Sequence, residues 1–107
     1  MSKVSILGTE YNVIISDLND EDLSSNDGVC KFLDKEIVIR DRKYIPGGSD
    51  KAKDERIQTV LYHELVHAFG HESGTSYDNN EELTDWIARM IPKINKAYQK
   101  IRKDLGI

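Results

Sequence analysis

The sequence is poor in cysteine, the residue that cross-links many small domains, and it has no long apolar run. It contains one cysteine, Cys30, among 107 residues. One cysteine permits no internal disulfide and no cysteine zinc cluster, and the strand-like residues around it favour a buried or half-buried thiol over a nucleophile. No apolar run approaches the ~20 residues of a membrane span, and residues 1–10 lack the apolar stretch of a secretory signal. We therefore expect a cytoplasmic protein without a membrane partner.

An excess of basic residues is also missing. Fifteen Lys and Arg stand against nineteen Asp and Glu, which gives a net charge of -4. General affinity for a nucleic-acid backbone needs a basic face, so we expect no nucleic-acid partner. The hydrophobic fraction of 38% is too high for a disordered chain. This length suits one domain, residues 1–107, that folds without staples.

The first half of the chain predicts strands. Four segments are rich in aliphatic and β-branched residues: residues 4–7, 11–16, 29–33 and 36–40. The first two flank Gly8-Thr9-Glu10 and the last two flank Asp34-Lys35, so each pair predicts a hairpin. The acidic segment 17–28 predicts a loop with room for one helical turn.

The second half predicts two helices after the breaker Pro46-Gly47-Gly48, where residues 49–50 offer an N-cap. The first helix is expected from about residue 51 to residue 70 or 71. The second is expected from about residue 80, with Pro92 kinking or restarting it. Its apolar positions form an amphipathic stripe at helical spacing: Leu83, Ile87, Ile91, Ile94, Tyr98, Ile101 and Leu105. Strands followed by helices predict an α+β fold with a small antiparallel sheet made of two hairpins.

The first predicted helix contains the sequence His63-Glu64-Leu65-Val66-His67. Two histidines four residues apart project from one helical face and can share a zinc ion. Zinc lowers the pKa of a bound water from ~15.7 to about 7, and a carboxylate beside that water can take its proton. Projection at ~100° per residue places Glu64 inside the apolar arc of the helix, which is unusual for a surface glutamate. The alternative is a polar helix face with two incidental histidines.

Three residues compete to be the third metal ligand. His71 continues the four-residue step, but a rigid helix would carry its side chain one turn past the metal. Glu81 and Glu82 begin the second helix, where acids are also favoured by the helix dipole. Projection places Glu81 beside the small residues Thr84 and Ala88, which permit close helix approach, so Glu81 is the better inward candidate.

Two further residues are assigned supporting roles. Asp85 lies one turn beyond Glu81 and is suited to accept the second ring N–H of a zinc-bound histidine, which fixes the tautomer. Tyr77, in the connection between the helices, is a candidate for stabilising the oxyanion of a tetrahedral intermediate. Simple packing is the alternative for Tyr77.

The motif His63-Glu64-Leu65-Val66-His67, followed by residues 81–88, resembles the gluzincin arrangement, in which HExxH is completed by an ExxxD pattern on a following helix. More closely, it resembles the short bacterial and phage-encoded members of the ImmA/IrrE group of zinc metallopeptidases. The resemblance covers roughly residues 57–91. It implies a minimal zincin-like domain with one zinc ion, the ligands His63, His67 and Glu81, a catalytic Glu64 and a supporting Asp85.

The expected function is zinc-dependent hydrolysis of a peptide bond, with Glu64 as general base and a cytoplasmic peptide or protein as substrate. The alternative is a non-catalytic zinc-binding regulatory or interaction module of a phage or mobile element. Such zinc proteases commonly pair an extended peptide with a sheet edge. The strand at residues 36–40 is nearest in sequence to the helix, and its charged ends suit an exposed edge. An interior position for this strand is the alternative.

Overall fold

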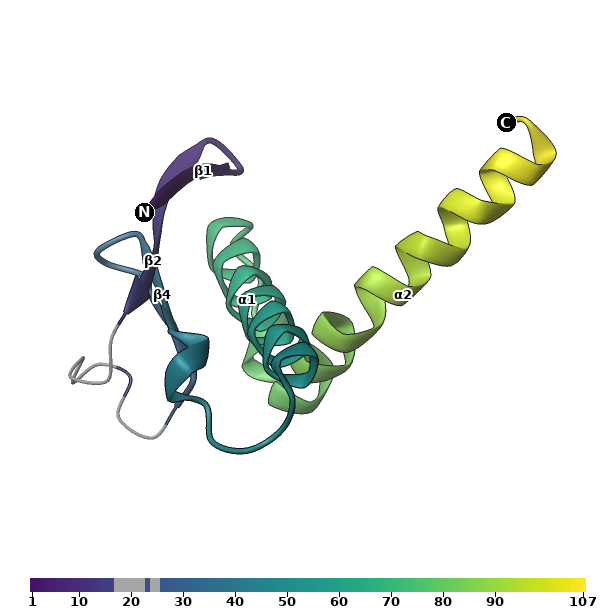
Figure 1. Cartoon of the computed structure of the whole chain (residues 1–107). Coiled ribbons are helices and arrows are strands. Elements are labelled where there is room, and N and C mark those ends of the chain that lie inside the picture. Colours follow the sequence, from purple (N-terminus) through teal and green to yellow (C-terminus); the bar gives the residue numbers. More distant parts are fainter. Residues whose placement is uncertain (17–22, 24–25) are drawn as a thin grey trace.

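The computed structural model describes residues 1–16, 23 and 26–107, in which four strands precede two long helices (Figure 1). The elements are β1 (Ser2–Ile6), β2 (Thr9–Ser16), β3 (Gly28–Lys31), β4 (Glu36–Arg40), α1 (Asp50–Glu72) and α2 (Glu81–Leu105), with short 3-10 turns η1 (Arg42–Tyr44) and η2 (Tyr77–Asn79). The loop predicted for residues 17–28 lies mostly outside the described residues. The α+β class is confirmed.

The four strands form one mixed sheet in the order β1-β2-β4-β3. The two predicted hairpins are present, because β1 pairs with β2 and β3 with β4 in antiparallel fashion. The prediction of a purely antiparallel sheet is wrong, because β2 and β4 join the hairpins as parallel neighbours. Leu7 and Gly8 form the first turn with positive φ angles of 50° and 89°, as a two-residue hairpin turn requires. This turn is shorter than the predicted Gly8-Thr9-Glu10.

The strand β4 is interior, so the prediction that it forms an exposed edge is wrong. Three consecutive residues, Ile37, Val38 and Ile39, are each at most 1% exposed. A strand whose successive side chains are all buried is covered on both faces of the sheet and is flanked on both sides. The free edges among the described strands are therefore β1 and β3.

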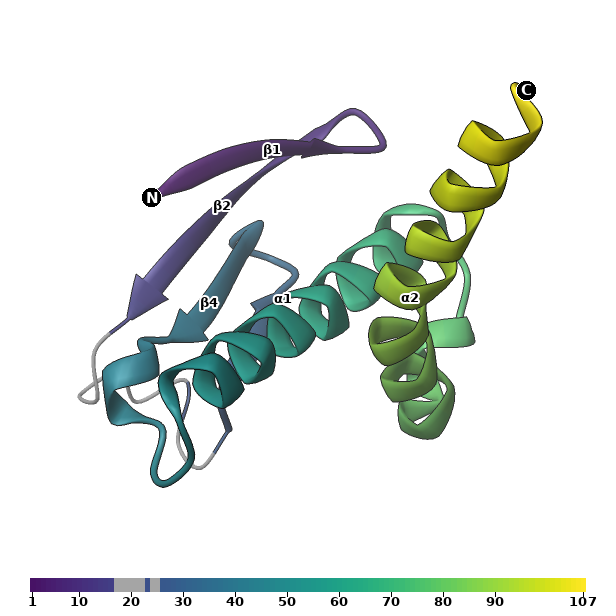
Figure 2. The ribbon, with the colours of Figure 1, turned by 45° about the vertical axis from the view of Figure 1, so that its right-hand side comes forward.

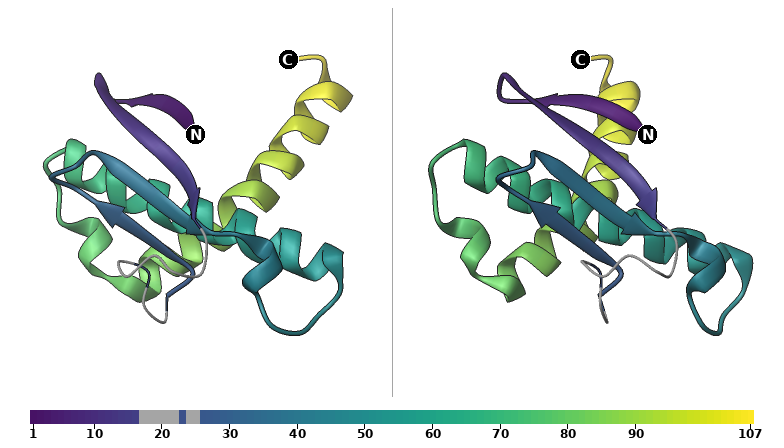
Figure 3. Two further views of the ribbon diagram at one scale, coloured as in Figure 1. Left: turned by 60° about the vertical axis from the view of Figure 1, so that its left-hand side comes forward. Right: turned by 90° about the vertical axis from the view of Figure 1, so that its left-hand side faces the viewer.

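Helix α1 runs across one face of the sheet, and the core lies between them (Figures 2 and 3). The buried core residues are Ile6, Tyr11, Ile37, Ile39, Val60 and Ala68. The helix begins after Ser49, whose hydroxyl accepts a hydrogen bond from the Ala52 amide at 3.1 Å and so satisfies one of the free N–H groups of the first turn.

A polar cluster ties the last turn of α1 to the sheet. Glu72 accepts hydrogen bonds at 2.9 Å from the buried Tyr11 hydroxyl and from the Lys35 ammonium. The Lys35 ammonium and then the Tyr11 hydroxyl lower the pKa of Glu72 to about 2. Burial, followed by the hydrogen bond to Glu72, raises the pKa of Tyr11. The carboxylate therefore stabilises the end of α1 in its ionised form.

Helix α2 packs on α1 and on η2 through the first half of its length, where its buried residues are the small Thr84 and Ala88. It begins after Asn80, whose side chain accepts a hydrogen bond from the Leu83 amide at 3.0 Å. The helix continues through Pro92 without a break, so Pro92 does not restart it. Its second half extends away from the rest of the molecule (Figure 1). Within the described residues, neither helix is long and apolar enough to span a bilayer.

Candidate metal centre

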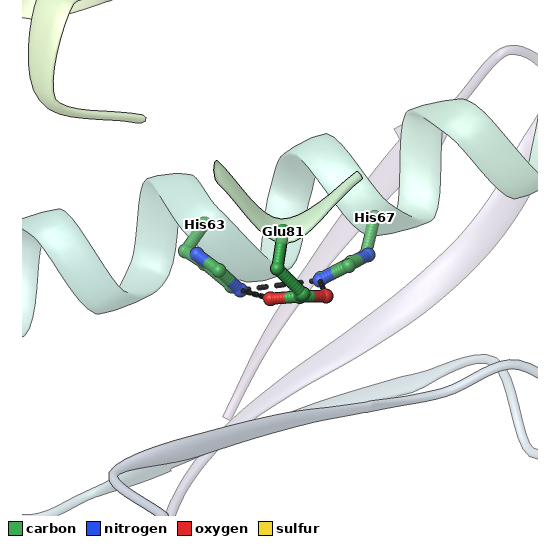
Figure 4. A group of neighbouring side chains, drawn as sticks. All are labelled: His63, His67 and Glu81. Carbon is green, nitrogen blue, oxygen red and sulfur yellow. Dashed lines mark hydrogen bonds and ion pairs between the residues drawn. The ribbon is translucent and has the colours of Figure 1, made fainter. Parts of the chain in front are cut away.

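Three side chains from two helices converge at the start of α2. His63 and His67 lie one turn apart on α1, and the short connection after α1 returns the chain so that Glu81, the first residue of α2, faces them (Figure 4). The two histidine Nε2 atoms are 3.1 Å apart. The Glu81 carboxylate places one oxygen 3.2 Å from Nε2 of His63 and the other 3.0 Å from Nε2 of His67. Among the described residues, this is the group of His, Cys, Asp and Glu side chains that is placed to hold a metal ion.

The hydrogen-bond partners of the two rings make this cluster suited to a cation. Each Nδ1 faces a carboxylate: Nδ1 of His63 is 2.9 Å from Asp85 and Nδ1 of His67 is 3.2 Å from Asp78. Because a neutral imidazole carries one N–H, donation from Nδ1 leaves a lone pair on each Nε2. Lone pairs of two imidazoles and a carboxylate thus point at one another and repel. A positive ion between them would replace this repulsion with attraction.

The separations are compatible with a metal ion. Ligands at the usual Zn–N and Zn–O distances of ~2.0–2.2 Å lie about 3.3 Å from one another in a tetrahedron. The two histidine Nε2 atoms are 3.1 Å apart, and each lies 3.0–3.2 Å from a different oxygen of the Glu81 carboxylate. With one ligand atom taken from each residue, all three lie within 4.8 Å of one another. Two imidazoles and one carboxylate form a donor set typical of catalytic zinc, which leaves a fourth position open.

Asp78 is the supporting residue that the sequence analysis missed. It lies in η2, it is 8% exposed, and its carboxylate reaches Nδ1 of His67. Two neighbours hold it in place. The Thr84 hydroxyl donates to the Asp78 backbone carbonyl at 3.2 Å. Gly70 leaves the necessary space, because a Cβ at residue 70 would lie 2.4 Å from an Asp78 carboxylate oxygen.

Glu64 is buried beside the two histidines. It is 6% exposed, and one carboxylate oxygen lies 3.9 Å from Nε2 of His63. Burial raises the pKa of Glu64, while the neighbouring His63 and His67 lower it in part. A carboxylate with a raised pKa at this position is suited to exchange a proton with a group held at the cluster.

A cleft of about 380 Å³ gives access to the cluster. The strand β3 forms one wall, and α1 and the first turns of α2 form the other. Gly28 allows the strand to approach α1 closely, because a Cβ there would lie 2.6 Å from Val60. The start of this wall is anchored by Asp27, which forms ion pairs with Arg40 at 3.2 Å and with Arg56 at 3.1 Å.

The remaining sequence-predicted residues lie away from the three donors. The ring of His71 stacks on Phe32 with centroids 4.4 Å apart. Tyr77 is 74% exposed and lines a second groove on a different face of α1, so the structure does not bring it to the cleft. Cys30 is half-buried in the cleft wall, and burial raises the pKa of its thiol to about 12. A thiol that stays protonated at neutral pH is a poor nucleophile.

Comparison with known proteins gives no independent assignment, since no family model, curated protein or solved structure shows significant similarity to this chain.

Proposed function

We propose that this protein is a zinc-dependent peptidase with His63, His67 and Glu81 as metal ligands and Glu64 as general base. The observation that carries the proposal is the convergence of three side chains that can ligate a metal beside a buried carboxylate in an open cleft. A closed structural site would need a fourth protein ligand. The nearest candidate in sequence, His71, is stacked on Phe32, so no observation favours the non-catalytic alternative.

Each residue then has a defined task. His63, His67 and Glu81 would hold a zinc ion, which would supply Lewis acidity and lower the pKa of a nearby water to about 7. The Glu64 carboxylate accepts the proton of the attacking water and afterwards donates it to the leaving amine. Asp85 and Asp78 accept the Nδ1–H groups of His63 and His67, which leaves both Nε2 lone pairs free to bind a metal.

The strand β3 is the proposed binding edge for the substrate. The Arg40 amide donates to the Asp27 carbonyl at 2.8 Å. In the register of β3 and β4, hydrogen-bonded positions therefore include Asp27 and, two residues further on, Val29. Because backbone groups alternate in direction along a strand, Val29 faces β4, whereas Gly28 and Cys30 present their N–H and C=O groups to the edge. This edge borders the cleft, so an extended peptide paired with it would pass the metal cluster.

The substitution Glu64→Gln tests the proposal, because it preserves shape and removes the base. We expect zinc content equal to that of the wild type and hydrolysis reduced by about 10²–10⁴. The assay is cleavage of a random peptide library by the zinc-loaded proteins, followed by mass spectrometry. A Glu64→Gln protein that cleaves at the wild-type rate, or a zinc-loaded wild type that cleaves no member of the library, would refute the proposal.

A further inference from the structure

The second half of α2 carries an apolar stripe that touches nothing in the described structure. Its members are Ile94, Tyr98, Ile101 and Leu105, and each is between 54% and 66% exposed. The second half of α2 extends away from the rest of the molecule, and its C-terminal end stands alone (Figures 1 and 2). Four half-exposed large side chains on one helix face form a docking surface rather than scattered surface residues.

The spacing of the stripe indicates a helix–helix contact. From Ile87 to Leu105 the apolar residues step by four, three, four, three and four, which is the heptad period of 3.5 residues. The stripe is narrow, because Asn95 and Arg102 border it on one side and Asp104 on the other. An a/d stripe of this width is typical of a packed helix seam, whereas a helix that lies in a membrane surface has a wider apolar face.

A groove that fits such a helix is present on the same chain. It has a volume of about 430 Å³ and lies between α1, the turn of the first hairpin and the first half of α2. Most of the residues that line it are apolar, among them Tyr62, Leu65, Phe69, Ile87 and Ile91. Phe69 and Ile91 are 44% and 41% exposed. Because α2 is continuous through Pro92 and points away, its second half cannot fold back into the groove of its own chain.

The charges favour a second copy in antiparallel orientation. Residues 92–107 contain five basic residues and one acidic residue, so they carry a net charge of +4, and residues 1–91 carry -8. The first half of α2 is itself acidic, with Glu81, Glu82 and Asp85 against Arg89. Parallel helices would place two basic halves side by side, whereas antiparallel helices place each basic half beside an acidic half.

We propose that two copies of this chain form a symmetric dimer, in which the second half of α2 of each copy occupies the apolar groove of the other. The contact is self-complementary, as a two-fold interface requires, because each chain supplies one helix and one groove. The metal cleft lies on a different face of α1 and stays open, so this proposal is independent of the proposed peptidase activity.

Sedimentation velocity of the full chain over a concentration series tests the dimer. We expect a species of twice 12.2 kDa. The double variant Ile94→Ser with Ile101→Ser removes the stripe and should sediment as a monomer. The control, Gln99→Ser, lies away from the stripe and changes no charge, so this variant should remain dimeric. Circular dichroism of both variants checks that α2 keeps its helical content.

A third variant, Phe69→Ser, tests the groove separately and should also give a monomer. A dimer that survives Phe69→Ser would show that the helices associate without the groove and would overturn the proposal. A wild type that remains monomeric at all concentrations would also overturn it, as would a monomer that binds vesicles of phosphatidylserine and phosphatidylcholine through residues 94–105.

Discussion

Gly70→Ala is expected to weaken zinc binding although Gly70 does not touch the metal ligands. A Cβ at residue 70 would lie 2.4, 2.6 and 2.8 Å from three side-chain atoms of Asp78, closer than any ordinary contact. The Asp78 carboxylate must therefore move away and lose its 3.2 Å contact with Nδ1 of His67. Loss of such a supporting carboxylate typically lowers metal affinity by about 10–100-fold.

The effect on stability is expected to be smaller, because two contributions oppose each other. Alanine is favoured over glycine inside a helix by about 1 kcal/mol, whereas overpacking a filled site costs about 1–3 kcal/mol. The free energy of unfolding should thus fall by roughly 0–2 kcal/mol. Zinc affinity and stability are measured by chelator competition and by urea unfolding.

A double-mutant cycle with Asp78→Ala separates this mechanism from general damage. In the Asp78→Ala background the added methyl group of Gly70→Ala still meets the Cβ of residue 78 at 2.8 Å, but it has no carboxylate to displace. The further loss of zinc affinity should therefore be smaller than in the wild-type background. Wild-type zinc affinity in Gly70→Ala, or the same loss in both backgrounds, would refute the argument that Gly70 acts through Asp78.

Three other comparisons between variants are expected to give the following results. Glu81→Ala should weaken zinc binding far more than Glu82→Ala in the same chelator titration, and equal losses would exclude Glu81 as the ligand. Val38→Pro should abolish cooperative unfolding, because it removes a ladder hydrogen bond from an interior strand. Cys30→Pro at the free edge should instead stay folded, keep zinc and cleave peptides poorly. Glu72 has a pKa lowered from 4.5 to about 2. Its ionised form therefore contributes fully to stability above pH 4.5, and this contribution disappears as the pH falls toward 2. The difference in Tm between wild type and Glu72→Gln should therefore shrink over this pH range, and a constant difference would contradict it.

Local patterns in the sequence predicted the helices and the three side chains that the structure brings together: His63, His67 and Glu81. The HExxH spacing places His63 and His67 on one face of α1, and projection of the second helix distinguishes Glu81 from Glu82. These inferences depend on helical periodicity alone, which neighbouring residues determine. The buried position of Glu64, 6% exposed in the structure, follows from the same projection.

Features that depend on distant pairing were not predictable in this way. The parallel contact of β2 with β4 joins two hairpins across the segment after residue 16, and no local pattern specifies it. The unbroken apolar run from Ile37 to Ile39 was the available signal for an interior strand. Asp78 was missed because its contact with His67 depends on how the connection between the helices folds. A glycine inside a helix, Gly70, was the available signal that another group approaches there.

Elemental analysis of the purified protein tests whether His63, His67 and Glu81 bind one zinc ion. The protein is expressed without added metal, dialysed to remove loosely bound ions, and compared with His63→Ala prepared in the same way, with circular dichroism to check that both are folded. We expect close to one zinc per wild-type chain and very little in His63→Ala. A folded wild type without zinc, or equal zinc in the two proteins, would contradict this expectation.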